Sequence, residues 1–365
     1  MSDAYSAAGV DTAAGERAVD LMRAAVHAAS RAEVVGGLGG FAGLFDASTL
    51  ATYRRPLLAT ATDGVGTKIA VAQAMDIHHT IGIDLVAMVV DDIVVCGAEP
   101  LFLTDYIACG RVVPERIAAI VTGVASGCQL AGCALLGGET AEHPGLLGPD
   151  EYDVAGAGTG VVEADALLGP ERVRDGDVLV AMAASGLHSN GYSLARKVLL
   201  ADTGWDLSRH LDSLGRTLGE EMLEPTRIYA RDALALANSL GTDLHAYSHI
   251  TGGGLAANIA RVLPRHLAAD VHRDTWTPLP IFGLIGDVGS VSRHDLEHTF
   301  NMGVGMVAVV AAAAADRAVH ELTARHVPAW VVGTVRDRRQ SEAGDAPAKG
   351  GTGGAVTLVA AHPAG

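Results

Sequence analysis

The sequence has few of the features that direct a protein to a membrane or to nucleic acid. Its 365 residues carry a formal net charge of −16 and contain no block of Lys or Arg, which argues against a nucleic-acid or membrane-surface partner. The longest nearly uncharged apolar run, residues 303 to 315, is too short to span a bilayer and is typical of a buried strand that enters a helix. No basic segment precedes an apolar stretch at the N-terminus, so we expect a cytoplasmic protein.

Cysteine and lysine are also scarce. The four cysteines, at positions 96, 109, 128 and 133, lack CxxC spacing and lie in apolar surroundings. We therefore expect buried free thiols in a reducing compartment rather than a metal site or disulfides. Only three residues are lysine, Lys68, Lys197 and Lys349, which draws some attention to a lysine in a glycine loop.

Length and pattern predict two α/β (α+β) domains. A chain of 365 residues exceeds the usual size of one hydrophobic core, and 49% hydrophobic residues suffice for two. We place the boundary at the Gly-Pro turn and charged segment 169–177, which gives domains 1–168 and 169–365. The expected strands are 57–62, 101–108, 133–138, 152–162, 177–183, 304–310, 329–335 and 355–360; the expected helices are 12–31 (capped by Asp11 or Thr12), 84–96, 114–132, a helix from 192, 225–240 and a helix after 254. Residues 341–354 are rich in Gly and Ala and indicate a surface loop.

The most informative segment is TATDGVGTK, residues 60–68. Asp63 offers a hard metal an oxygen ligand, and Gly64 and Gly66 let backbone N–H groups approach a phosphate. Thr67 and Lys68 close the loop, and Lys68 adds a positive charge. The segment is neither a GxxxxGK[ST] loop nor a GxGxxG dinucleotide fingerprint.

Three further segments have the composition of anion-binding loops. The glycine-rich segment 36–45, with Gly37, Gly39 and Gly40, is either a loop that folds over a ligand or an ordinary flexible loop. The turn formed by Thr251, Gly252, Gly253 and Gly254 precedes a helix, and a backbone nest for phosphate explains its three glycines best. His188, Ser189 and Asn190 precede another helix, where they either bind an anion or cap the helix.

Acidic residues follow or interrupt several of the predicted elements. Asp63, Asp105 and Glu139 fall at or just beyond the ends of strand-like runs, where ligands gather in open sheets. On the helix predicted from residue 84, Asp91 and Asp92 either bind a metal or pair with arginines, whereas Asp84 most simply caps the helix. His78 and His79 are interpreted as surface residues, and His143 has no partner at a recognisable spacing.

Together these segments resemble the aminoimidazole ribonucleotide synthetase family, the phosphoribosylformylglycinamidine cyclo-ligases. The motifs run in order over residues 5 to 335: YSAAGVD, GGLGGF, TDGVGTK, IGIDLVAM, GAEPLF, GGETAEHPG, YDVAG, DGDVL, SGLHSNGYS, PTRIY, ITGGG and FNMGVGM. A dozen collinear motifs make chance a poor explanation. The sequence departs from the family pattern at Asp91, where Asn is common, at His143, where Met is common, and in the segment 341–354.

The resemblance implies a two-domain fold whose N-terminal strands form a barrel across a homodimer. It implies ATP-dependent closure of formylglycinamidine ribonucleotide to aminoimidazole ribonucleotide in purine biosynthesis, with ATP phosphorylating the formamide oxygen. Asp63, Asp92 and Glu139 would then hold Mg²⁺, Lys68 and the loop glycines would stabilise the transferred phosphate, His188 would accept a proton, and the Thr251–Gly254 turn would hold the ribose phosphate. The alternatives are another phosphoryl-activating enzyme of the same superfamily and a non-catalytic nucleotide-binding module.

Overall fold

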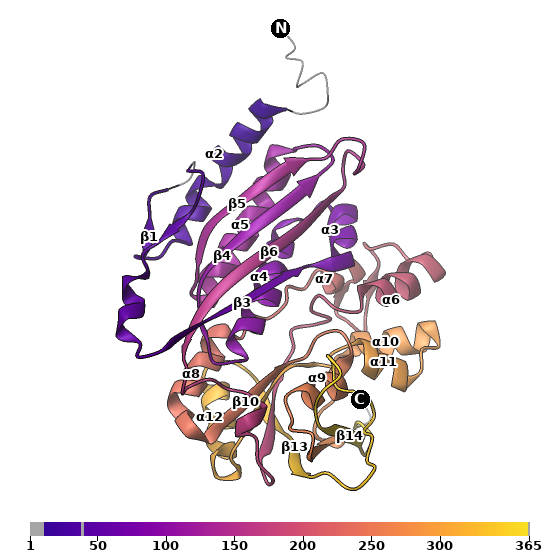
Figure 1. The fold of residues 1–365 in the computed structure, drawn as a ribbon. Helices are drawn as coiled ribbons and strands as arrows, with labels where there is room; N and C mark the ends of the chain where they lie inside the picture. Colours follow the sequence, from indigo (N-terminus) through magenta and orange to yellow (C-terminus); the bar gives the residue numbers. More distant parts are fainter. Residues whose placement is uncertain (1–10, 38–39, 364–365) are drawn as a thin grey trace. The chain divides into compact units, whose positions relative to one another are not determined.

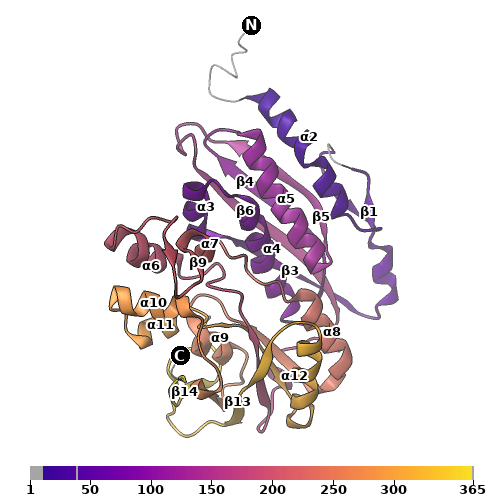
Figure 2. The same ribbon diagram turned by 180° about the vertical axis from the view of Figure 1, so that it is seen from behind.

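The computed structural model describes residues 11–37 and 40–363, which form two compact units (Figures 1 and 2). The first unit comprises the described residues up to Val94 together with Ala98–Asp165, and the second comprises Val95–Gly97 and the residues from Ala166 onward. No helix among the described residues is long and apolar enough to cross a bilayer.

The first unit places helices on one face of a four-stranded sheet (Figure 1). Strand β3 pairs antiparallel with β6, β6 antiparallel with β4, and β4 parallel with β5. Its helices are α2 (Thr12–Ala28), α3 (Ile69–Met75), α4 (His79–Val94) and α5 (Pro114–Ala131), and its strands are β1 (Val34–Val35), β2 (Leu44–Phe45), β3 (Pro56–Gly64), β4 (Glu99–Cys109), β5 (Ala134–Glu142) and β6 (Tyr152–Glu163).

Helix α4 packs against bare backbone of β6. Alternate residues of this strand, Gly156, Gly158 and Gly160, face the helix, and a Cβ at Gly158 would lie 2.8 Å from Val89 Cγ1. A Cβ at Gly160 would lie 2.5 Å from a methyl carbon of Ile93. Any larger residue at these positions would push the helix away from the sheet, so the glycines fix a close helix–sheet distance.

The opposite face of this sheet carries exposed apolar side chains. Leu58 on β3 is 64% exposed and Tyr106 on β4 is 41% exposed. Both belong to the set of alternate residues that points away from α4 and α5.

The second unit contains a six-stranded sheet with the order β10-β12-β7-β13-β11-β14. All neighbouring pairs are antiparallel except β11 and β14, which are parallel. Helix α12 packs on β7 and β13, and α9 contacts β10 and β14. The helices are α6 (Tyr192–Arg196), α7 (Leu218–Met222), α8 (Ala230–Leu240), α9 (Gly254–Arg261), α10 (Pro280–Gly289), α11 (Arg293–Thr299) and α12 (Ala315–Ala324), and the strands are β7 (Val178–Ala183), β8 (His210–Leu211), β9 (Arg216–Thr217), β10 (Leu244–His249), β11 (Leu267–His272), β12 (Val304–Val310), β13 (Ala329–Asp337) and β14 (Ala355–Val359).

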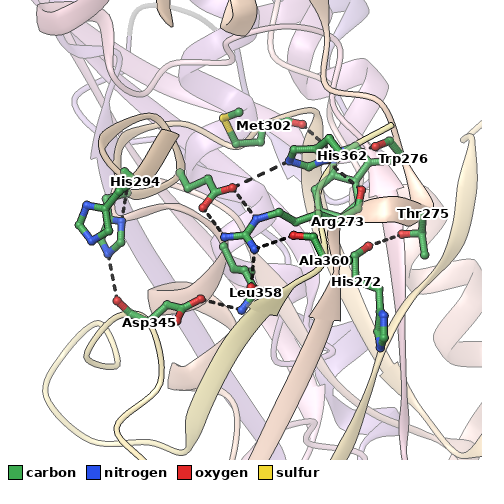
Figure 3. A network of polar contacts seen from close by, with 12 residues as sticks. His272, Arg273, Thr275, Trp276, His294, Met302, Asp345, Leu358, Ala360 and His362 are labelled. Atoms are coloured by element: carbon green, nitrogen blue, oxygen red, sulfur yellow. Dashed lines mark hydrogen bonds and ion pairs between the residues drawn. The ribbon is translucent and has the colours of Figure 1, made fainter. Parts of the chain in front are cut away.

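A network of polar contacts anchors β14 and the loop before it (Figure 3). The Arg273 guanidinium forms a two-bond ion pair with Glu297 on α11, at 2.6 and 2.7 Å, and also donates to the carbonyl of Leu358. Asp345 accepts the Leu358 N–H at 2.7 Å, and the carbonyl of Asp345 contacts His298. The loop 341–354 is therefore tied down at its start.

Most of the predicted elements are present, with shifted boundaries. Asp11 caps α2 through the Ala14 N–H, as expected. Helix α4 begins at His79 rather than near Asp84, and α8 begins at Ala230 rather than at 225. Strands β10 and β11 were not predicted. All four cysteines are free, and three of them are buried.

Candidate functional site

The TDGVGTK segment forms a tight link between β3 and α3. Strand β3 ends at Gly64, residues 66–68 form a 3₁₀ turn, and α3 follows directly. The Asp63 carboxylate accepts the N–H of Gly64 at 2.7 Å. Gly66 has a φ of +70°, a left-handed conformation that favours glycine. The strand–turn–helix geometry is the one expected for a phosphate-binding loop. Binding of a phosphate or a metal ion by these residues remains a prediction.

Lys68 is completely buried and pairs with Asp84. Its Nζ lies 2.9 Å from the Asp84 carboxylate, whose side chain is also fully buried. The prediction that Asp84 caps its helix is wrong, because α4 begins five residues earlier and Asp84 lies inside it. A phosphate that meets Lys68 would share this ammonium group with Asp84.

Asp63 and Asp105 lie on the same face of the sheet. Both are paired in register with Gly156 of β6, one on each side of it, so their side chains point the same way. Asp105 is in the middle of β4 rather than at a strand end, which corrects the sequence-based expectation. Glu139 pairs with Tyr106 and is exposed; strand alternation therefore puts it on the opposite face.

The predicted metal ligands are not assembled into one cage in this structure. Asp63 and Glu139 lie on the two outer strands, and Asp92 is an exposed residue of α4. Throughout residues 11–37 and 40–363, no three His, Cys, Asp or Glu side chains are grouped closely enough to hold a metal ion. The neighbouring Asp91, by contrast, is fully buried. The assignment of Asp63, Asp92 and Glu139 to a metal remains a prediction.

The glycine-rich segment 36–45 lines two cavities beside α2. Gly37 borders one of about 580 Å³, and Gly40 borders another of about 340 Å³. Gly39 lies outside the described residues. Glycines that line two cavities are compatible with a loop that folds over a ligand, and both this interpretation and that of an ordinary loop stay predictions.

In the second unit, Asn190 joins two of the predicted anion-binding segments. Its side-chain oxygen accepts the N–H of Gly252 at 2.9 Å, while Ser189 contacts Thr226 at 3.0 Å. Gly253 and Gly254 have φ values of +101° and +72°. The N–H groups of Gly252 and Gly254 already donate within the protein, to the Asn190 side chain and to the Thr251 carbonyl, so the phosphate nest at this turn stays a prediction.

His188 is held rigidly rather than exposed. It is 1% exposed, has a φ of +60°, and its Nε2 accepts the Ser185 N–H at 3.1 Å. Gly305 makes room for it, because a Cβ there would lie 2.6 Å from the His188 ring. The role of His188 as proton acceptor stays a prediction, and the structure adds that its Nε2 is engaged by backbone.

Sequence reasoning missed Lys349, the lysine of the C-terminal loop. Its Nζ donates to Thr251 Oγ1 at 2.8 Å, and its backbone N–H donates to the carbonyl of Ala257 on α9. The loop passes so close to α9 that a Cβ at Gly353 would lie 2.1 Å from the Ala260 oxygen. The glycine content of the loop indicates close packing. Nothing in the sequence near Lys349 indicates that its partners are Thr251 and α9.

The sequence predicted that His78 and His79 both lie on the surface. His78 is buried and contacts Asp76 and Tyr152, so the prediction is wrong for this residue. His79 is exposed, as predicted. His143 contacts the Tyr106 hydroxyl at 3.2 Å. Neither arrangement resembles a metal or catalytic site.

Comparison with known proteins gives consistent results over both units. The family models described as AIR synthase related protein, N-terminal domain and C-terminal domain, match residues 46–162 and 174–345. The chain is 52% identical to a phosphoribosylformylglycinamidine cyclo-ligase of Shouchella clausii (strain KSM-K16) over 336 residues, 92% of this chain and 96% of the relative. It is 50% identical to the enzyme of that name from Thermosynechococcus vestitus over 332 residues, 91% and 96% of the two chains.

Solved structures share the fold at lower sequence identity. Thiamine-monophosphate kinase from Stenotrophomonas maltophilia K279a aligns with a TM-score of 0.63 at 20% identity, covering 93% of this chain and 95% of the kinase. The hydrogenase maturation protein HypE, solved in complex with ATP, aligns with a TM-score of 0.57 at 18% identity, covering 88% and 86%. At these identities the similarity shows the two-unit α/β fold alone.

Proposed function

Because this chain belongs to the phosphoribosylformylglycinamidine cyclo-ligase family, we infer that it closes the imidazole ring of aminoimidazole ribonucleotide in purine biosynthesis. The substrate is formylglycinamidine ribonucleotide, and ATP is converted to ADP and phosphate. The observation that carries this conclusion is 52% identity over 92% of the chain to a relative of that name. Two of the alternatives in the superfamily, thiamine-monophosphate kinase and HypE, share the fold with this chain at 20% and 18% identity.

The chemical problem of this reaction is a poor leaving group. The formamide oxygen is a poor leaving group. Phosphorylation by ATP converts it into a good one, so the amidine nitrogen can attack the formamide carbon and phosphate then leaves. We assign the offsetting of charge on the transferred phosphate to Lys68 and the backbone of Gly64 and Gly66. His188 remains the proposed acceptor of the proton lost by the nitrogen.

We assign the ribose phosphate of the substrate to the Thr251–Gly254 turn. The start of α9 suits an anion through its helix dipole and its first N–H groups. Lys349 brings a positive charge to Thr251, and Asn190 holds the turn through Gly252. A phosphate there would receive charge-assisted hydrogen bonds from a loop that is anchored at its start.

We propose that Mg²⁺ accompanies ATP. Mg²⁺ keeps several waters and usually takes one or two carboxylates plus substrate phosphates, so it does not need a cage of three protein carboxylates. Asp63 and Asp92 have the right donor chemistry, and β3 packs against the helix that carries Asp92. When bound, the metal would neutralise phosphate charge.

We further propose that a second copy of the chain covers the open face of the first unit's sheet, as in the barrel that the resemblance implies. The exposed Leu58 and Tyr106 support an interface there. Light scattering should give a dimer mass at micromolar concentration; a monomer mass would contradict the barrel. The four free cysteines fit the reducing cytoplasm as the place of the reaction.

A coupled assay for ADP release tests the function. Purified protein with ATP and formylglycinamidine ribonucleotide should release ADP only when both are present, and aminoimidazole ribonucleotide should accumulate in equal amount. Well-folded protein that releases no substrate-dependent ADP would contradict the proposal. Substitution of the ribonucleotide by thiamine monophosphate serves as the control for the kinase alternative.

A further inference from the structure

A groove at one end of the six-stranded sheet is lined by three arginines. Its volume is about 450 Å³, which lies within the range of pockets that hold small ligands. Strands β11 and β13 are paired there through Leu267 and Asp337, and the groove is formed by residues just outside both strands. We call it the arginine groove; its lining consists of Arg265, His266, Arg338, Arg339, Ser341, Glu342 and Ala343. None of these residues belongs to the segments assigned above to ATP or to the ribonucleotide.

The guanidinium of Arg338 is held in place by backbone carbonyls. Its Nε donates to the carbonyl of Glu342 at 2.8 Å, its Nη2 donates to the same carbonyl, and its Nη1 donates to the carbonyl of Arg265 at 3.2 Å. A guanidinium has more N–H donors than these three bonds use. Because a carbonyl has no net charge, the positive charge of Arg338 is oriented by these bonds without being neutralised.

The two carboxylates of this region are bound to a fourth arginine, Arg336. Its guanidinium forms a two-bond ion pair with Glu342, at 2.9 and 2.6 Å, and a second one with Asp270, at 2.7 and 2.7 Å. The hydrogen bonds from Arg336 lower the pKa of Glu342 to about 2. Glu342 also accepts the backbone N–H of Arg339 at 3.0 Å. The carboxylate that lines the groove therefore already has its partners.

The arginine groove has an excess of positive charge. Arg265 and Arg339 are exposed, and in the described part of the chain their side chains form no hydrogen bond or ion pair. Arg336 and the three arginines of the groove face two carboxylates, which leaves two positive charges in excess before His266 is counted. Asp337 lines a neighbouring cavity that shares only His266 with the groove. In a chain of formal net charge −16, such a local excess attracts anions.

A turn that is particular to this chain completes the groove. Ser341 has a φ of +65°, and the N–H of Glu342 donates back to the carbonyl of Arg339 at 3.2 Å. Both residues belong to the segment 341–354, in which the sequence departs from the family pattern. The family resemblance therefore assigns no ligand to the arginine groove.

We propose that the arginine groove binds a small molecule that carries a diphosphate or two phosphate groups. The proposal does not rest on the proposed function. Planar guanidinium groups match pairs of phosphate oxygens and form charge-assisted hydrogen bonds with them. Two positive charges in excess suit a ligand with at least two negative charges, and the Ser341 hydroxyl adds a donor at the rim. The volume of the groove suits a small molecule better than a segment of an acidic protein.

Isothermal titration calorimetry with inorganic pyrophosphate tests the proposal on the full chain. The groove variant combines Arg265→Gln with Arg339→Gln. A matched control combines Arg231→Gln with Arg293→Gln, two exposed arginines outside the groove, and changes the net charge equally. Wild type and control should bind pyrophosphate with the same Kd, whereas the groove variant should bind it at least tenfold more weakly, because charge-assisted hydrogen bonds are lost.

Hydrogen–deuterium exchange of the wild-type protein gives a second measurement that needs no variant. The peptide that spans residues 338–343 should exchange more slowly when pyrophosphate is present. Equal affinities of the groove variant and the control, no binding by wild type at millimolar pyrophosphate, or unchanged exchange of this peptide would each overturn the proposal. A hexaglutamate peptide that binds more tightly than pyrophosphate, and that the groove variant no longer binds, would overturn it in favour of an acidic protein partner.

Discussion

Replacing Lys68 by Met should destabilise the first unit strongly. Lys68 and Asp84 are both 0% exposed and lie 2.9 Å apart, so the variant leaves a buried carboxylate without its lysine. Removal of one partner of a buried ion pair costs about 3–5 kcal/mol. For a unit of this size that corresponds to a fall in Tm of about 6–20 °C. Thermal unfolding followed by circular dichroism and urea titration both measure the loss.

Two variants separate the charge from the packing. Lys68→Met combined with Asp84→Leu removes both charges and should recover most of the lost stability. Lys197→Met breaks an exposed pair with Asp202, whose side chains are 66% and 50% exposed, and should cost less than about 1 kcal/mol. A loss below about 1 kcal/mol for Lys68→Met alone would refute the reasoning. A stable double variant that retains full turnover would make Lys68 a structural residue only.

The remaining predictions concern Asp63, Lys349 and Asp105. Asp63→Asn should abolish turnover in the ADP-release assay with an unchanged Tm, since the amide oxygen can still accept the Gly64 N–H; near-normal activity would remove Asp63 from the site. Lys349→Met should raise KM for the ribonucleotide about tenfold with little change in kcat, because one charge-assisted hydrogen bond is lost, whereas Lys197→Met should leave KM unaltered. Burial raises the pKa of Asp105 to about 7, which means that its contribution to stability is complete below about pH 4 and is lost as pH rises through about 7. Asp105→Asn should therefore show a smaller fall in unfolding free energy between pH 5 and pH 8 than wild type, and an identical fall would contradict the burial of the acid.

The sequence predicted local structure well where one strong signal decided it. Helix α5 runs from Pro114 to Ala131, because proline starts it and Gly132 ends it in a left-handed conformation. The TDGVGTK turn and the Thr251–Gly254 turn are also found where their glycines indicate. Collinear motifs identified the family, and the comparisons confirm it.

The sequence failed where a side chain's partner comes from a distant segment. Asp84 was interpreted as a cap because nothing local reveals the buried Lys68. The contact of Lys349 with Thr251 joins residues 98 positions apart, and the cavity of about 340 Å³ that Asp105 lines exists only because α2 packs on α5. Strand alternation likewise puts Glu139 and Asp63 on opposite faces, which a list of acids after strands does not show.

The glycines of β6 determine how the amide protons of α4 exchange with solvent. Because Gly156, Gly158 and Gly160 let α4 lie directly on the strand, the helix cannot separate from the sheet by small side-chain adjustments. Nearly all of α4 is buried, so its amide protons should exchange with deuterium only when the whole unit unfolds. The peptide that spans His79–Val94 would then be the last of this unit to gain mass, and it would report global rather than local stability.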